Sequence, residues 1–170
     1  MPNTLSEKQK WQKNLKQDEL KYILTKNDPT NPEDHGWIHI TLRDNKLNYK
    51  VSKARRIVLV GCGSYPYSLF DMAKKYSHNK DLIFIGIDYD EICYRICVSL
   101  RNKYNLQNFY FYQCRGIDFN YSNLIDEDMI FLSADLIDIE DTYWHIIKNS
   151  KAQVYICKPH KKSPGFYPGD

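Results

Sequence analysis

The fold class of this chain is decided by the stretch Arg56-Ile57-Val58-Leu59-Val60-Gly61-Cys62-Gly63-Ser64-Tyr65-Pro66. Its apolar run, residues 57–60, predicts a short buried strand. The two glycines that follow predict a sharp turn whose backbone a ligand can approach closely. Pro66 has a fixed φ and no N–H, so it suits the first turn of a helix. The stretch therefore predicts a strand, a tight loop and a helix.

The same alternation continues to the end of the chain. Short apolar runs predict strands at 57–60, 82–87, 109–114, 129–134 and 153–157. Segments with helical spacing predict helices at 68–77, 90–104 and 139–149. The apolar stripe expected to pack on the sheet in the second of these helices is Ile92, Cys93, Ile96, Cys97 and Leu100. Strands alternating with helices indicate an α/β, Rossmann-like fold with a mainly parallel sheet. Ligands of such sheets bind beyond the carboxyl ends of the strands, at the switch point beside the first strand.

Residues 1–55 follow a different pattern, and we interpret them as an extension to the domain formed by residues 56–170. Residues 5–26 carry spaced apolar positions, which indicates an amphipathic helix. Residues 37–42 and 47–51 flank the polar segment 43–46, a pattern that allows a hairpin. We expect this extension to pack over the ligand site or along the sheet, in its own chain or in a homodimer.

Composition excludes several classes of protein. The net charge is only +3, with no basic stripe, so nucleic acid is not an expected partner. The longest apolar runs are too short to span a bilayer, and the N-terminus has no signal-peptide core. Five cysteines, an odd number, indicate reduced thiols and a cytoplasmic location. Cys93 and Cys97 have a spacing compatible with metal ligation, but we interpret them as small apolar residues on a buried helix face and expect no metal.

Carboxylates follow the second and third predicted strands. Asp88, 27 positions after Gly61, suits the two hydroxyls of an adenosine ribose, although a helix cap is the alternative and Asp90 can fill that role instead. Asp118 followed by Phe119 suits the amine and the ring face of an adenine, and a turn residue is the alternative for Asp118. Pro66 disfavours a pyrophosphate, which relies on free N–H groups at a helix start. The pattern therefore favours S-adenosylmethionine, which contains adenosine but no phosphate, over a dinucleotide.

These residues resemble the class I S-adenosylmethionine-dependent methyltransferase superfamily. The matching elements are Gly61-Cys62-Gly63, Asp88, Asp118 and Phe131-Leu132-Ser133-Ala134-Asp135, across about residues 56–157. Leu59 is a departure, because common methyltransferases have an acidic residue two positions before the first glycine. The chain also ends just after the fifth strand, so we expect a sheet without the last strands of that superfamily. The cofactor-binding residues that the resemblance implies are Gly61, Cys62, Gly63, Ser64, Asp88, Tyr89, Asp118, Phe119, Ser133 and Ala134.

A narrower resemblance concerns the loop. Gly61-Cys62-Gly63-Ser64-Tyr65-Pro66-Tyr67-Ser68 is similar to the Gly-Ser-Gly-Pro-Leu-Pro-Leu-Thr loop of nicotianamine synthases. Residues 129–134 and Phe166-Tyr167-Pro168-Gly169-Asp170 also resemble segments of that family. The resemblance implies transfer of the 3-amino-3-carboxypropyl group of S-adenosylmethionine to an amine, or its cyclisation to azetidine-2-carboxylate, with release of methylthioadenosine.

Catalytic groups for such a reaction are expected near the strand ends. A base must keep an attacking amine neutral, and tyrosine faces favour a sulfonium by cation–π attraction. The candidates are Tyr65, Tyr67, Asp135 and Tyr143. Ordinary packing is the alternative for each tyrosine, and helix capping is the alternative for Asp135. At the level of the whole chain, a methyltransferase acting on a small molecule and a non-catalytic partner that keeps the fold both stay open.

Overall fold

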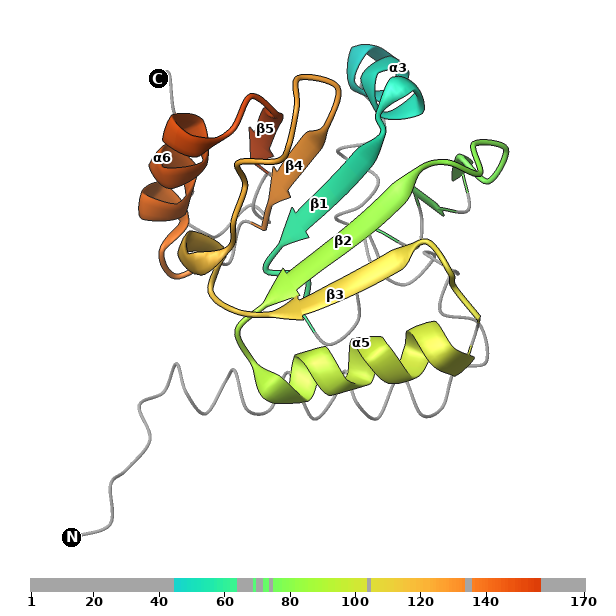
Figure 1. Ribbon diagram of the computed structural model, residues 1–170, viewed down its shortest axis with the longest axis horizontal. Coiled ribbons are helices and arrows are strands. Elements are labelled where there is room, and N and C mark those ends of the chain that lie inside the picture. Colours follow the sequence, from blue (N-terminus) through green and yellow to red (C-terminus); the bar gives the residue numbers. More distant parts are fainter. Residues whose placement is uncertain are drawn as a thin grey trace, which may run out of the picture.

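A parallel five-stranded sheet is the centre of the structure. The computed structural model describes residues 45–63, 69, 72, 73, 75–103, 105–133 and 136–156. The strands lie in the order β3-β2-β1-β4-β5 (Figure 1). Their bounds are β1 Arg56–Val60, β2 Ile83–Asp88, β3 Phe109–Gln113, β4 Met129–Leu132 and β5 Gln153–Ile156. The five predicted strands and their parallel arrangement are confirmed.

The switch point of this sheet lies beside β1. The chain proceeds from β1 through β2 to β3 on one side, then returns to place β4 and β5 on the other side. Val58 therefore pairs with Ile85 of β2 on one side and with Ile130 of β4 on the other. The loop after β1 consequently lies between the carboxyl ends of β2 and β4, where open α/β sheets bind ligands.

Both faces of the sheet are apolar and carry helices. On β1, Ile57 and Leu59 point into one core cluster, and Val58 and Val60 point into the other. Helix α5 (Glu91–Lys103) follows β2 and contributes to the first cluster, whereas α6 (Ile139–Asn149) follows β4 and contributes to the second (Figure 1). Near-continuous apolar strands are what a sheet buried on two faces requires.

The prediction of a strand at 47–51 is wrong, because these residues lie in helix α3 (Asn45–Lys53), which leads into β1 (Figure 1). Val51 and Ala54, three positions apart, are both buried in the first core cluster. Lys50 donates to the Tyr155 hydroxyl of β5 at 3.0 Å. Burial of these two residues, which have the spacing of a helix, thus decides the conformation of the segment. The alternation that suggested a hairpin is weak by comparison.

Helix α5 matches its prediction in extent, with one error in its buried face. Cys93 and Cys97 are buried, as their interpretation as packing residues requires. Ile92, which we placed on the apolar stripe, is 59% exposed. It lies in the first turn, beside the face that Cys93, Ile96 and Cys97 present to the sheet. The helix at 139–149 is confirmed as α6.

Some expectations fall partly or wholly outside the described residues. Of the helix expected at 68–77, positions 69, 72, 73 and 75 are helical, whereas 76 and 77 lie in the turn that follows. The helix at 5–26 and the hairpin segment at 37–42 lie outside the described part of the chain. The division at residue 55 and the homodimer stay predictions. Among the described helices, none is long and apolar enough to cross a membrane.

Candidate functional site

The loop Gly61–Gly63 is fixed to the carboxyl end of β2. The N–H groups of Gly61 and Cys62 both donate to the Ile87 carbonyl, at 2.8 and 3.1 Å. Gly61 and Gly63 have positive φ angles, +76° and +70°, which residues with a Cβ rarely adopt. This is the tight turn that the sequence predicts after the first strand.

The two glycines differ in their surroundings. A Cβ on Gly61 would lie 2.9 Å from Cδ2 of Leu136 and 3.1 Å from Cβ of Ser133, so the segment after β4 packs directly on this residue. A Cβ on Gly63 would have no described atom within 4 Å. The first glycine therefore allows close packing of two strand ends, and the second leaves an open surface of backbone that a ligand can approach.

Asp88, the last residue of β2, lies beside this loop. Its Oδ2 accepts the Gly63 N–H at 2.9 Å, and its Oδ1 accepts the Asp90 N–H at 3.0 Å. The cap of α5 is Asp90, whose Oδ1 accepts the N–H groups of Ile92 and Cys93. Asp88 is thus not the helix cap, and its half-buried carboxylate is held in one orientation against the glycine loop.

Two thiols lie beneath the same loop. Sγ of Cys97 donates to the Gly63 carbonyl at 3.3 Å, and Sγ of Cys62 approaches the same oxygen at 3.7 Å. The hydrogen bond with Cys97, followed by burial, raises the pKa of Cys62 well above its ordinary value of 9.0. Both cysteines are buried. Gly86 of β2 makes room here, because a Cβ on it would lie 3.1 Å from Sγ of Cys62.

The segment after β3 places Asp118 and Phe119 in a short 3-10 turn, Gly116–Asp118, and its exit. The Asp118 carboxylate is exposed and accepts no hydrogen bond from the described part of the chain. The Phe119 ring packs edge-on between Tyr112 and Tyr121, with centroid distances of 5.2 and 5.0 Å. Two aromatic contacts therefore hold this ring, and its role toward an adenine stays a prediction.

Close contacts hold this turn to the rest of the site. The Tyr121 hydroxyl donates to the Gly116 carbonyl at 2.7 Å, and burial raises the pKa of this tyrosine. A Cβ on Gly116 would lie 2.6 Å from Val60 and 2.9 Å from Thr142. The turn after β3 is consequently packed against the end of β1 and against α6.

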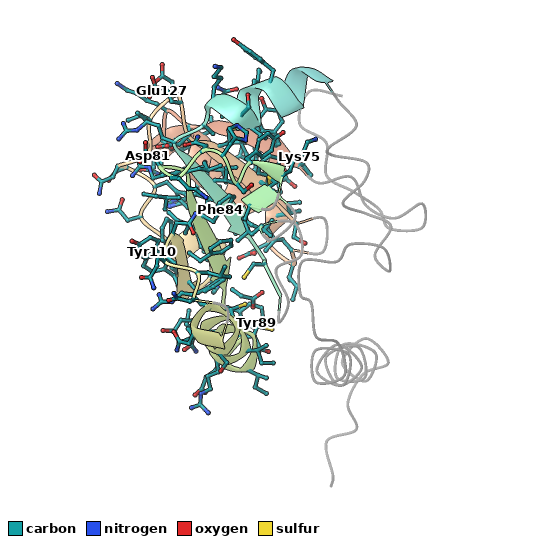
Figure 2. All side chains as sticks on the ribbon, turned by 90° about the vertical axis from the view of Figure 1, so that its right-hand side faces the viewer. Lys75, Asp81, Phe84, Tyr89, Tyr110 and Glu127 are labelled. Carbon is teal, nitrogen blue, oxygen red and sulfur yellow. The ribbon has the colours of Figure 1, made fainter. Side chains whose placement is uncertain are left out.

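The other predicted site residues that the structure describes lie at the end of β4, after β2 and on α6. Ser133 lies at the end of β4, where its N–H donates to the Val60 carbonyl at 3.0 Å. Tyr89, next to Asp88, is 57% exposed at the end of the sheet where α5 begins, opposite the end marked by Asp81 and Glu127 (Figure 2). Tyr143 is partly buried on α6 and packs edge-on against Trp144. Ser64, Tyr65, Tyr67, Ala134 and Asp135 lie outside the described residues.

The structure thus brings together Gly61, Cys62, Gly63, Asp88 and Ser133. Sequence reasoning missed Cys97 as part of this group, because it lies 34 positions from Gly63 and its spacing signals only a buried helix face.

Around the turn after β3, Arg115 donates to Asp138 at 2.9 Å, which raises the pKa of the arginine. Within the described residues no group of three or more histidine, cysteine or carboxylate side chains is arranged to hold a metal ion.

Comparison with known structures identifies the fold. No family model matches the sequence, and neither does any curated protein. Among solved structures, a protein of Methanococcus maripaludis assigned as an S-adenosyl-L-methionine-dependent methyltransferase matches with a TM-score of 0.58, over 83% of this chain and 62% of its own, at 16% identity. The fold is that of the S-adenosylmethionine-dependent methyltransferases.

Two further structures show the same methyltransferase fold. One is a methyltransferase of Aquifex aeolicus, at 18% identity, with a TM-score of 0.53 over 82% of this chain and 79% of its own. The other is coclaurine N-methyltransferase bound to N-methylheliamine and SAH, at 10% identity, with a TM-score of 0.54 over 70% of this chain. The chain spans 33% of the length of coclaurine N-methyltransferase and 38% of that of a StiE O-MT structure. At these identities the likeness concerns the fold.

Proposed function

We propose that this chain binds S-adenosylmethionine at the carboxyl ends of β1 and β2 and transfers a group from its sulfonium to a small-molecule acceptor. The observation that carries the proposal is the Asp88 carboxylate, fixed beside the open Gly63 backbone and relieved of helix capping by Asp90. A carboxylate oxygen has room for more than one hydrogen bond, so Asp88 is able to accept ribose hydroxyls while it keeps its bonds to the chain.

The residues around Asp88 fit this ligand in three respects. Gly63 offers open backbone for close approach, and Asp88 offers an acceptor for the ribose. Asp118, exposed after β3, offers an acceptor for the exocyclic amine of an adenine.

For the group transferred, we propose the 3-amino-3-carboxypropyl group. An amine nucleophile attacks the γ-carbon of the methionine moiety, the bond from that carbon to sulfur breaks, and methylthioadenosine leaves as a neutral thioether. The nitrogen then loses one proton to a base. Support comes from the resemblance of the 61–68 loop to nicotianamine synthases and from Leu59, which stands where methyltransferases carry an acidic residue and is buried in the core.

Methyl transfer is the second candidate, because the solved structures that share the fold are methyltransferases. The acceptor then attacks the methyl carbon, and S-adenosylhomocysteine leaves. The sulfonium activates both carbons, so the geometry of the acceptor decides between them. The two reactions differ in their nucleoside product, which makes them directly separable.

Product analysis tests the proposal. The purified full chain is incubated with S-adenosylmethionine, with and without amine acceptors, and the nucleosides are separated by liquid chromatography and mass spectrometry. Methylthioadenosine above the level of a protein-free control supports aminocarboxypropyl transfer or cyclisation. S-adenosylhomocysteine that forms only with an acceptor supports methyl transfer. Neither product, together with no binding of S-adenosylmethionine, refutes the proposed function and leaves a non-catalytic partner.

A further inference from the structure

Gly63 is held at both of the peptide groups in which it takes part. Its N–H donates to Asp88 at 2.9 Å, and its carbonyl oxygen accepts the Cys97 thiol of α5 at 3.3 Å. Cys62 approaches the same oxygen at 3.7 Å. Gly63, at φ +70°, has no side chain to restrict its backbone, so these bonds help to fix the orientation of its two peptide groups.

The neighbouring thiol of Cys62 keeps its proton beneath the loop. Only a protonated thiol donates a hydrogen bond. The bond with Cys97, followed by burial and the negative charge of Asp88, raises the pKa of Cys62. Cys62 therefore stays protonated at physiological pH, and no negative charge on it repels the Gly63 carbonyl or Asp88.

We propose that Cys97 is a positioning residue of the cofactor loop: its bond to the Gly63 carbonyl restricts the backbone conformation of Gly63, whose N–H bonds to Asp88. The inference rests on the proposed function, because the loop and Asp88 are the groups assigned to S-adenosylmethionine. Cys97 itself touches neither ligand nor reacting atoms. Its contribution is to raise the fraction of molecules whose loop is already in the binding conformation, and apparent affinity scales with that fraction.

Three variants of the full chain test this role. Cys97→Ala removes the donor, and Cys97→Ser keeps a donor in a smaller side chain. Cys93→Ala is the matched control. Cys93 is also buried and lies one turn earlier on α5, whereas the thiols that bond to the Gly63 carbonyl are those of Cys97 and Cys62. The ligand is S-adenosylhomocysteine, titrated by calorimetry, and the ligand-free loop is observed through the ¹³C carbonyl shift of Gly63.

We expect Cys97→Ala to weaken binding roughly three- to tenfold, because a buried carbonyl that loses its donor favours other loop conformations. Cys97→Ser should bind within about twofold of the wild type, and so should Cys93→Ala, even where both alanine variants lower the melting temperature equally. The Gly63 carbonyl shift should move in Cys97→Ala, and it should also respond in Cys97→Ser, since a hydroxyl is a stronger donor than a thiol.

Equal weakening by Cys93→Ala and Cys97→Ala would overturn the inference, because it would mark a general packing effect. An unmoved Gly63 shift in Cys97→Ser would also overturn it, and this measurement decides the matter if the alanine variant does not fold. If the wild-type chain binds neither S-adenosylmethionine nor S-adenosylhomocysteine, the proposed function fails, whereas the Gly63 shifts of the variants without ligand still report whether Cys97 holds the loop.

Discussion

Replacing Asp88 by alanine removes the carboxylate that accepts two backbone N–H groups, those of Gly63 and Asp90. Hydrogen bonds to a charged group are worth about 1.5–3 kcal/mol each when buried. Asp88 is only half-buried, so water replaces part of what is lost, and we expect stability to fall by about 1–2 kcal/mol in total. The effect on the ligand is larger, since the variant also lacks the acceptor for the ribose.

The assay is calorimetric titration of the full chain with S-adenosylhomocysteine, beside a thermal melt of each variant. We expect Asp88→Ala to weaken binding by roughly ten- to a hundredfold, which corresponds to the loss of one charged hydrogen-bond partner. The affinity of Asp88→Asn should lie between those of the wild type and Asp88→Ala. The amide oxygen is able to accept one hydrogen bond, whereas the NH₂ group faces the other backbone N–H and cannot accept from it.

Asp90→Ala provides the matched control. Asp90 is a carboxylate two positions away, and it caps α5 through the N–H groups of Ile92 and Cys93. Losing such a cap costs about 1 kcal/mol of stability. This variant should therefore melt earlier and still bind S-adenosylhomocysteine within about twofold of the wild type. If Asp88→Ala binds as tightly as the wild type, or no more weakly than Asp90→Ala, the assignment of Asp88 to the ligand is refuted.

Three further changes have definite expected outcomes. Gly86→Ala places a Cβ 2.7 Å from the Phe111 ring, and this overpacking should lower the free energy of unfolding by about 1–3 kcal/mol. Denaturant unfolding measures it, and an unchanged free energy would mean that the ring moves aside freely. Tyr121→Phe leaves the Gly116 carbonyl without its 2.7 Å donor, and should lower the free energy of unfolding by about 1–2 kcal/mol, an outcome that an unchanged melt contradicts. Cys62 binds its proton more tightly in the folded chain than in the unfolded one. The stabilisation linked to this proton is therefore complete below pH 9.0 and is lost as the pH rises further. The free energy of unfolding, measured from pH 8 to 11, should therefore fall in the wild type and fall less in Cys62→Ser.

The sheet and the position of Asp88 were predictable from the sequence because both depend on local pattern. The strands are short apolar runs buried on two faces, and their order along the chain alternates with helices, which restricts the topology to parallel βαβ units. Asp88 was identified by its place at the end of the second strand, next to a glycine loop. Its alternative as a helix cap was separable only in the structure, where Asp90 occupies that role.

Helix α3 was not predictable in the same way. The segment 47–51 alternates well enough for a strand, and its five residues are too few to distinguish a period of two from one of 3.6. What fixes the helix is tertiary: Val51 and Ala54 meet the sheet, and Lys50 reaches Tyr155 more than a hundred positions away. Ile92 was misplaced for a related reason, since periodicity defines a stripe but not where the stripe ends.

The contacts that orient the site also depend on distant residues. Cys97 reaches Gly63 across 34 positions, and the rotation of α5 that brings it there is set by packing over the whole helix. Gly86 and Gly116 are needed because the Phe111 ring and the Thr142 side chain approach their Cα atoms closely, and no local pattern announces such contacts. Sequence therefore predicts which residue types stand at the strand ends, whereas it does not predict which of them are locked together.

That locking bears on how such a site works. Asp88 is held by two backbone N–H groups, and side chains hold both peptide groups of Gly63, so the acceptor and this part of the loop are fixed in one arrangement. A preoriented site loses little conformational entropy on binding, and more of the interaction energy then appears as affinity. The bonds reach from the end of β2 through Gly63 to α5, so a change at buried Cys97 alters binding without touching the ligand. Gly61, packed under Leu136 and Ser133, extends the same rigid group to the end of β4.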